Sequence, residues 1–144
     1  MMSRRKARIL AFQALYCYDA VDIPVESLLN FDWEAEKIVS LNSEVLAFAR
    51  NLTAGTIENL DIIDEKIKEH LINWNFSRLK RVDLAVLRIG VYSLLFQKDI
   101  PSEVIIEEAI VISKEYGGDG SFKFVNGVLD NIKKTLKDAG SPEK

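Results

Sequence analysis

The segment 82–97 is apolar on every side of the helix that its spacing predicts, and this feature constrains the fold most strongly. Its apolar residues are Val82, Leu84, Ala85, Val86, Leu87, Ile89, Val91, Tyr92, Leu94, Leu95 and Phe96. A helix without a polar face is stable in water only when other elements surround it. The segment therefore predicts a central buried helix.

Arg88 places a positive charge inside this apolar segment. An unpaired charge in such a position would cost several kcal/mol, so a carboxylate should bind the guanidinium. We expect the partner to come from the following helix, and Glu108 is the predicted residue. The pair would be structural and not catalytic.

The rest of the chain also favours helices. It has only seven glycines and three prolines, and the prolines lie between or after periodic segments. Apolar spacing of three and four residues predicts further helices at about 3–18, 24–30, 43–57, 61–71, 102–116 and 121–136. Residues 33–40 stay uncertain, and the helices at 43–57 and 61–71 could form one continuous helix. The predicted fold class is all-α.

Several residues mark the ends of these helices. Asn42 or Ser43 is expected to cap the helix at 43–57, and Ser121 is expected to cap the last helix. Gly55 lowers the stability of its helix by about 1 kcal/mol relative to alanine, so it indicates close packing. The glycine-rich stretch 117–120 ends a helix, and we expect the tail at 138–144 to be flexible.

The start of the chain is basic although the whole chain is acidic. The first eight residues include four cations and no acid, in a chain of net charge −3: Arg4, Arg5, Lys6 and Arg8. Cations at a helix N-terminus face the positive end of the helix dipole, so stability does not explain them. With Phe12, Tyr16 and Tyr18 behind them, they indicate a local contact with an RNA backbone and unstacked bases. An idle, solvated cluster is the alternative on composition alone.

The start of the last helix is a second candidate contact for phosphate. Gly118, Gly120 and Ser121 leave backbone N–H groups available, and Lys123 adds a positive charge. An ordinary capped turn is the alternative interpretation.

Catalytic and metal-binding patterns are missing from the sequence. His70 is the only histidine, so a His-based metal site or a Ser-His-Asp triad cannot be built. Cys17 is the only cysteine, which excludes an internal disulfide and favours a reducing compartment. No segment reads as a signal peptide or membrane span. We therefore expect a cytoplasmic protein that is not an enzyme, needs no cofactor or metal, and does not contact a membrane.

Several blocks of the sequence together resemble the bacterial NusB family of transcription antitermination factors. The blocks are Arg4-Arg5-Lys6-Ala7-Arg8, Gln13-Ala14-Leu15-Tyr16, Ala85-Val86-Leu87-Arg88-Ile89-Gly90-Val91-Tyr92, Asp99-Ile100-Pro101, Glu108-Ala109 and Phe124-Val125-Asn126-Gly127-Val128-Leu129-Asp130. Their order and spacing match the family over about residues 4–132. The resemblance implies an all-α fold of about seven helices in two packed antiparallel bundles, at about 3–58 and 60–136 of a single RNA-binding domain.

The resemblance also implies a function and its site residues. Family members bind the boxA element of nascent ribosomal RNA transcripts together with NusE, which is ribosomal protein S ten, and so help RNA polymerase to read through terminators. By position, the RNA contacts fall on Arg4, Arg5, Lys6, Arg8, Tyr16, Lys123 and Phe124. A contact with NusE falls on Asp83, where an acid suits a basic partner.

The sequence leaves alternatives of function, oligomeric state and RNA preference open. The N-terminal RNA-binding domain of a ribosomal RNA cytosine methyltransferase shares this helical fold, but the sequence shows neither the cysteine nucleophile nor the methyl-donor loop of a catalytic domain. A helical adaptor that binds only proteins is the alternative from another class. The resemblance leaves both a monomer and a homodimer open, and it does not give the preferred RNA sequence.

Overall fold

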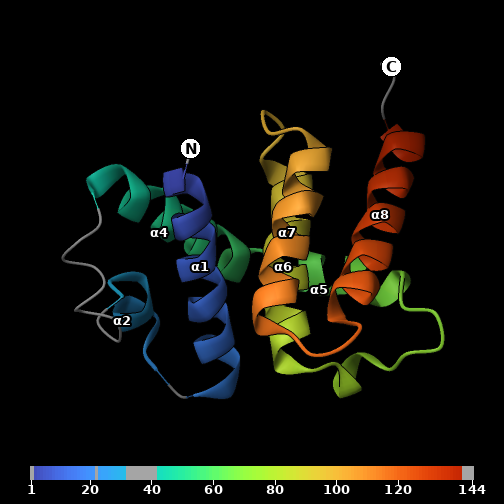
Figure 1. The fold of residues 1–144 in the computed structure, drawn as a ribbon, viewed down its shortest axis with the longest axis horizontal. Coiled ribbons are helices and arrows are strands. Elements are labelled where there is room, and N and C mark those ends of the chain that lie inside the picture. The colour runs from blue at the N-terminus through green and yellow to red at the C-terminus, as the bar shows by residue number, and fades with distance from the viewer. Residues whose placement is uncertain (1, 22, 32–41, 141–144) are drawn as a thin grey trace.

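The computed structural model describes residues 2–21, 23–31 and 42–140, in which helices alternate with short connections (Figure 1). The helices are α1 (Met2–Ala20), α2 (Val25–Leu29), α4 (Ser43–Glu58), α5 (Leu60–Glu69), the 3-10 helix η2 (Phe76–Arg78), α6 (Arg81–Phe96), α7 (Ser102–Tyr116) and α8 (Ser121–Gly140). No strand occurs in the described ranges, and the predicted all-α fold is confirmed. The uncertain segment at 33–40 lies outside them.

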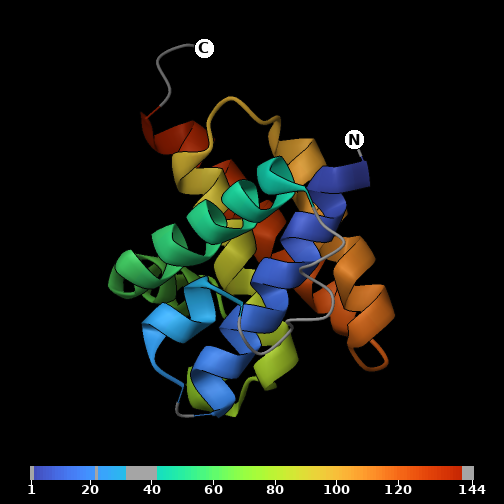
Figure 2. The same cartoon turned by 90° about the vertical axis from the view of Figure 1, so that its left-hand side faces the viewer.

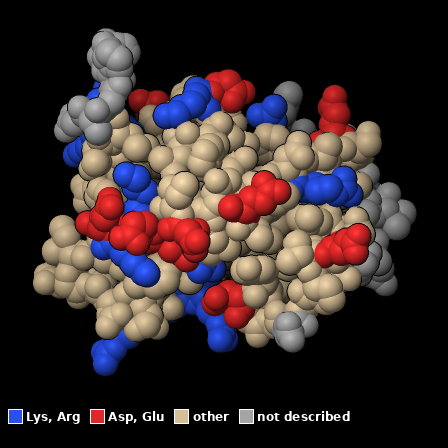
Figure 3. All heavy atoms as spheres, turned by 180° about the vertical axis from the view of Figure 1, so that it is seen from behind, with Lys and Arg blue, Asp and Glu red and all other residues tan. Residues whose placement is uncertain are grey.

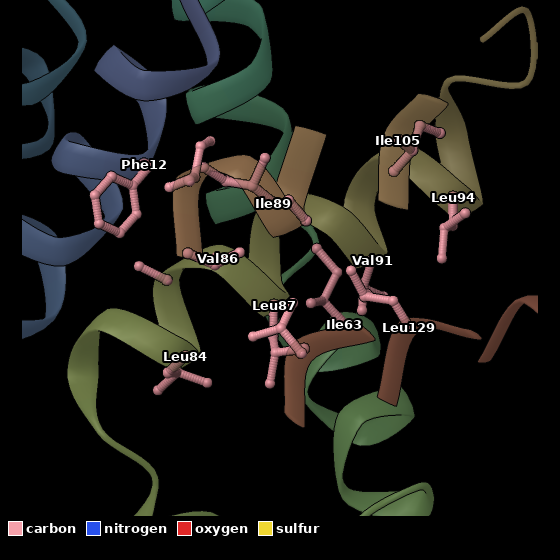
Figure 4. Close-up of a cluster of buried hydrophobic side chains, with 14 of the residues drawn as sticks. Phe12, Ile63, Leu84, Val86, Leu87, Ile89, Val91, Leu94, Ile105 and Leu129 are labelled. Carbon is pink, nitrogen blue, oxygen red and sulfur yellow. The ribbon is translucent and has the colours of Figure 1, made fainter. Parts of the chain in front are cut away.

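Helix α6 is the centre of the fold, as the sequence predicts. Residues 83–91 are all buried, and α6 packs against α1, α4, α5, α7 and α8. Figure 4 shows Leu87 and Val91 of α6 among Ile63 of α5 and Leu129 of α8. Because neighbours cover every side of α6, its apolar residues need no polar face.

Helix α1 has two buried sides. Ala11, Phe12 and Leu15 join the large core around α6, whereas Ala7, Leu10 and Ala14 form a smaller core with α2 and α4. Figure 1 shows α1, α2 and α4 on one side of the molecule, and Figure 2 shows α1 beside α4. The division into bundles at 3–58 and 60–136 stays a prediction.

The helix ends follow the polar residues, with some differences from expectation. The side chain of Asn42 accepts a hydrogen bond from the Val45 backbone N–H at 2.8 Å, so Asn42 caps α4. Asn59 separates α4 from α5, and its side chain donates to the Gly55 carbonyl at 2.8 Å. The two segments are therefore two helices. Helix α1 continues to Ala20, beyond the expected end near Tyr18.

Gly55 lies against an aromatic ring, which explains a glycine inside α4. A Cβ atom built on Gly55 would collide with the ring of Tyr92 from α6. The missing side chain therefore lets α4 approach α6 closely, as the sequence indicates.

The connection from α7 to α8 differs in detail from the predicted cap. Ser121 is the first residue of α8, and its hydroxyl accepts a hydrogen bond from the Gly118 backbone N–H at 3.1 Å. Gly120 has a φ of 84°, which favours glycine. Helix α8 continues to Gly140, whereas the sequence predicts a flexible tail from Asp138 onward. Residues 141–144 lie outside the described ranges.

Arg88 is bound by a carboxylate, as predicted, but the predicted partner Glu108 is wrong. Arg88 donates from Nε and Nη2 to the two carboxylate oxygens of Asp64, both at 3.0 Å. Its Nη1 lies 3.8 Å from Oδ1 of Asp19 at the end of α1. The side of α6 that carries Arg88 faces α5 and the end of α1, whereas Glu108 on α7 pairs with the first turns of α1. Sequence spacing does not show which helix covers which side.

We predict that Arg88→Met lowers the free energy of unfolding by about 2–4 kcal/mol, because it leaves the carboxylate of Asp64 without its partner. Urea denaturation of a double-mutant cycle with Asp64→Asn should show strong coupling between the two positions. The same cycle with Glu108→Gln is the control and should show additive effects. Coupling of Arg88 to Glu108 instead of Asp64 would contradict the observed pairing.

Candidate nucleic-acid interface

The four cations at the start of α1 differ in exposure. Arg4, Arg5 and Lys6 are exposed, whereas Arg8 is only 8% exposed. Arg8 lies one turn further along α1, where α7 comes close enough for Glu108 to reach it. Three cations are therefore available to a ligand, and Arg8 is largely part of the helix packing.

Glu108 binds this cluster from α7. Arg5 donates from Nε and Nη2 to Oε1 and Oε2 of Glu108, at 3.0 and 2.9 Å. Nη1 of Arg8 lies 4.0 Å from Oε1 of the same carboxylate. The hydrogen bond from Arg5 holds the pKa of Glu108 below its usual range. Burial lowers the pKa of Arg8, and Glu108 opposes that shift.

Phe48 of α4 holds two of these guanidinium groups from the other side. The Arg4 guanidinium lies 4.4 Å from the centre of the Phe48 ring, and that of Arg8 lies 5.6 Å from it. A cation is attracted to the face of an aromatic ring at such distances. Phe48 and Glu108 together fix the directions of the arginines, although the sequence does not indicate Phe48.

The aromatic residues predicted on α1 are divided between the core and the surface. Phe12 is 3% exposed, and its ring centre lies 5.2 Å from that of Tyr116 in α7. Tyr16 is 38% exposed and so is accessible to a ligand. Arg8 and Phe12 are therefore buried, whereas Arg5 and Tyr16 on the same helix are accessible.

The start of α8 carries the second group of predicted residues. Lys123 is exposed, while Phe124 is partly buried against the main core. The ring centre of Phe124 lies 5.3 Å from that of Trp74, a contact that sequence reasoning missed. The only signal for Trp74 is an aromatic residue between two asparagines, outside any helical pattern. Lys80 adds a cation nearby, because its Nζ is 3.2 Å from where a Gly118 Cβ would be.

The predicted residues at the start of α1 and those at the start of α8 lie towards opposite ends of α7. Figure 1 shows α1 running from the N-terminus beside α7, and the end of α7 turning into the start of α8. Glu108 and Arg5 connect α1 and α7 near the N-terminus, and Phe12 and Tyr116 connect them further along. A ligand that touches both groups must extend along α1 and α7.

Asp83 is almost completely buried, so little of its side chain is available to a partner. It lies in the first turn of α6 and is 7% exposed, because α6 is surrounded by other helices. Its Oδ1 is buried and accepts no hydrogen bond from any described residue. An acid in the first turn of a helix interacts favourably with the helix dipole. Its Oδ1 can still accept a hydrogen bond from a donor outside the described residues.

The residues that could suggest catalysis have structural contacts. Nδ1 of His70 lies 2.8 Å from the Lys66 carbonyl oxygen, and Nε2 lies 3.0 Å from the Thr135 hydroxyl. These contacts attach the end of α5 to α8. Among the described residues, no group of three His, Cys, Asp or Glu could hold a metal ion. None of the helices described is both long and apolar enough to span a membrane.

The charges on the rear face are mixed. Figure 3 shows Lys and Arg interspersed with Asp and Glu across the drawn residues of that face, with wide uncharged areas between them. Such a surface provides no extended positive field for a nucleic acid. A contact with RNA would therefore depend on the local cations described above.

Comparison with known proteins gives one consistent result. A family model described as the NusB family matches residues 5–134. The transcription antitermination protein NusB of Treponema pallidum (strain Nichols) is 50% identical over 134 residues, which are 93% of this chain and 94% of that protein. That of Geobacter sp. (strain M21) is 43% identical over 143 residues, covering 96% of this chain and 99% of that protein.

Solved structures of similar proteins share the fold. NusB of T. maritima superposes with a TM-score of 0.80 at 42% identity, covering 91% of this chain and 90% of that chain. A chain from the crystal structure of antitermination factors NusB and NusE in complex with dsRNA superposes with a TM-score of 0.84 at 30% identity. The match covers 94% of this chain and 98% of that chain.

We predict that Glu108→Gln lowers stability at neutral pH and that the difference from the unmodified protein disappears in acid. The folded protein holds the pKa of Glu108 below its ordinary value of 4.5. The stabilisation is therefore fully present above about pH 4.5 and is lost as the pH falls through the folded value. Urea denaturation from pH 7 to pH 3 measures the difference. Glu107→Gln is the control, since Glu107 is exposed and forms no ion pair with a described residue. An equal pH dependence in both variants would contradict the assignment.

Proposed function

This chain belongs to the NusB family, and we propose that it binds boxA RNA of nascent ribosomal RNA transcripts together with NusE, ribosomal protein S ten. It is a transcription antitermination factor and not an enzyme. A solved relative contains NusB and NusE in complex with dsRNA, which supports NusE and RNA as partners. Through them the protein joins the antitermination complex of RNA polymerase in the cytoplasm.

The observation that carries this proposal is the exposed charge at the start of α1. Arg4, Arg5 and Lys6 are exposed at a helix N-terminus, where cations reduce stability. Among the described residues, the ion pairs of this cluster go to Glu108 alone. The cluster therefore keeps a surplus of positive charge, which a phosphate backbone would neutralise.

The residues of the interface have different roles in this proposal. Arg4, Arg5 and Lys6 contact phosphates, and Arg8 acts from beneath by keeping Glu108 in place for Arg5. Tyr16 offers its exposed ring to an unstacked base further along α1. At the start of α8, Lys123 contacts the backbone and Phe124 contributes an aromatic surface.

NusE would bind near the first turn of α6. The unpaired Oδ1 of Asp83 supports this position, since a donor from a basic partner would satisfy a buried acceptor. Only a small part of Asp83 is exposed, so the partner would reach it at the edge of α6.

The double variant Arg5→Gln with Lys6→Gln should bind a boxA-like RNA about tenfold more weakly at moderate salt. Loss of two phosphate contacts should also reduce the slope of log affinity against log salt by about 1.4. Fluorescence anisotropy across a salt series, with and without NusE, measures both values. A scrambled RNA tests sequence dependence.

The matched control is Lys134→Gln with Lys137→Gln, which removes the same charge from exposed positions of α8. The control should keep its affinity apart from a small effect of net charge. Equal losses in both double variants would contradict a local site on α1. If the unmodified protein binds no RNA even with NusE, the function is that of a protein-only adaptor.

We expect Asp83→Asn to weaken the binding of NusE at least tenfold, because the change removes the negative charge while it keeps the shape of the side chain. Calorimetric titration with NusE measures this effect. RNA binding by the variant alone should equal that of the unmodified protein. Unchanged affinity for NusE, in a variant that unfolds at the same urea concentration, would contradict the role of Asp83.

A further inference from the structure

Trp74 is an exposed aromatic residue that the α1 site does not use. It lies in the connection between α5 and η2 and is 56% exposed. Its ring centre lies 5.3 Å from that of Phe124, with an angle of 54° between the ring planes. Phe124 therefore covers part of the ring, and the rest of the indole faces solvent. Tryptophan is enriched at binding interfaces, because its ring offers a large apolar face and its N–H can donate a hydrogen bond.

The connection that carries Trp74 is fixed at both ends. His70 contacts the Lys66 carbonyl and the Thr135 hydroxyl, which attaches the start of the connection to α5 and α8. At the other end, Oδ1 of Asn75 accepts hydrogen bonds from the backbone N–H of Ser77 at 3.0 Å and from its hydroxyl at 2.8 Å. These bonds fix the two ends of the connection before any ligand arrives, and the Trp74 ring itself rests against Phe124. A connection that is already ordered loses less entropy on binding.

The backbone between these ends turns sharply to present the ring. Asn73 has a φ of 63°, in the left-handed region that asparagine tolerates better than most residues. The turn places Ile72, which is 70% exposed, and Trp74 in the same connection. Ile72 is not part of the aromatic contact, so it provides a matched apolar control.

Three exposed cations lie close in sequence to the aromatic pair or beside the connection that leads into α8. Arg78 ends η2 and is exposed, Lys80 lies beside Gly118, and Lys123 precedes Phe124 on α8. None of these three cations forms an ion pair with a described residue. The connection between α7 and α8 also carries one exposed acid, Asp119. This surface suits an anionic ligand and would repel a basic protein.

We propose that Trp74 and Phe124 form a stacking platform for an unpaired base of the RNA, with Arg78, Lys80 and Lys123 along the phosphate backbone. The platform rests on the proposed function and extends its site, since Phe124 belongs to both. Stacking on an aromatic ring accepts any base, whereas the cations set the dependence on salt. RNA bound at the start of α1 thus continues past the end of α7 to the start of α8, where Figure 1 shows the two helices joined.

The test compares three variants of the whole chain in RNA binding. Trp74→Ala should weaken the binding of a boxA-like RNA about tenfold, in the range of single base–aromatic contacts. Its salt slope should equal that of the unmodified protein, because no cation is removed. Trp74→Phe should recover most of the affinity, and Ile72→Ala should change it less than twofold. All are measured by fluorescence anisotropy with and without NusE.

A direct signal comes from the fluorescence of the ring itself. Trp33 is the only other tryptophan in the sequence, so in a Trp33→Phe background the emission reports Trp74 alone. Adding RNA should quench this emission, and adding NusE alone should not. If the quenching and the anisotropy saturate at the same RNA concentration, both signals report the same binding event, with a base stacked on Trp74.

The outcomes separate this inference from the proposed function. If the unmodified protein binds RNA and Trp74→Ala binds it equally well, the platform is wrong while the proposed function stands. If Trp74→Ala instead loses affinity for NusE with RNA binding unchanged, the surface is a protein contact and the inference is overturned. If the unmodified protein binds no RNA with or without NusE, both proposals fail.

Discussion

The fold depends on the burial of α6 and on the neutralisation of Arg88 within it. Five helices cover α6, and this burial supplies the main favourable free energy of the large core. Arg88 would oppose that burial if it lacked a partner, but the bidentate contact with Asp64 and the nearby Asp19 satisfy its guanidinium. The same charges attach α5 and the end of α1 to α6, so one polar cluster fixes three helices.

A second acid organises the surface in a similar way. Glu108 on α7 binds Arg5 and lies near Arg8, while Phe48 on α4 packs against Arg4 and Arg8. These contacts reduce the repulsion between neighbouring cations and give the arginines defined directions. They leave Arg4 and Lys6 without a described ion pair, so the start of α1 combines an ordered structure with surplus charge. This combination is what a site for a phosphate backbone requires.

Helix α7 connects the start of α1 to the start of α8. The contact of Phe12 with Tyr116 connects α1 to the end of α7, next to the connection that leads into α8. The aromatic residues at the start of α8 are therefore held at a fixed position relative to the cations of α1. A flexible, single-stranded ligand could follow such a surface, whereas the mixed charges of the rear face offer it little (Figure 3).

The sequence by itself determined the helices, the central position of α6 and the family, because apolar spacing and local motifs depend on residues close together in the chain. It also indicated the cations of α1 and the close packing at Gly55. Tertiary structure alone decided that Arg88 pairs with Asp64, that Arg8 and Phe12 are buried, and that Trp74 contacts Phe124. These facts depend on which side of a helix each neighbour covers, and that is set by the packing of segments far apart in the sequence.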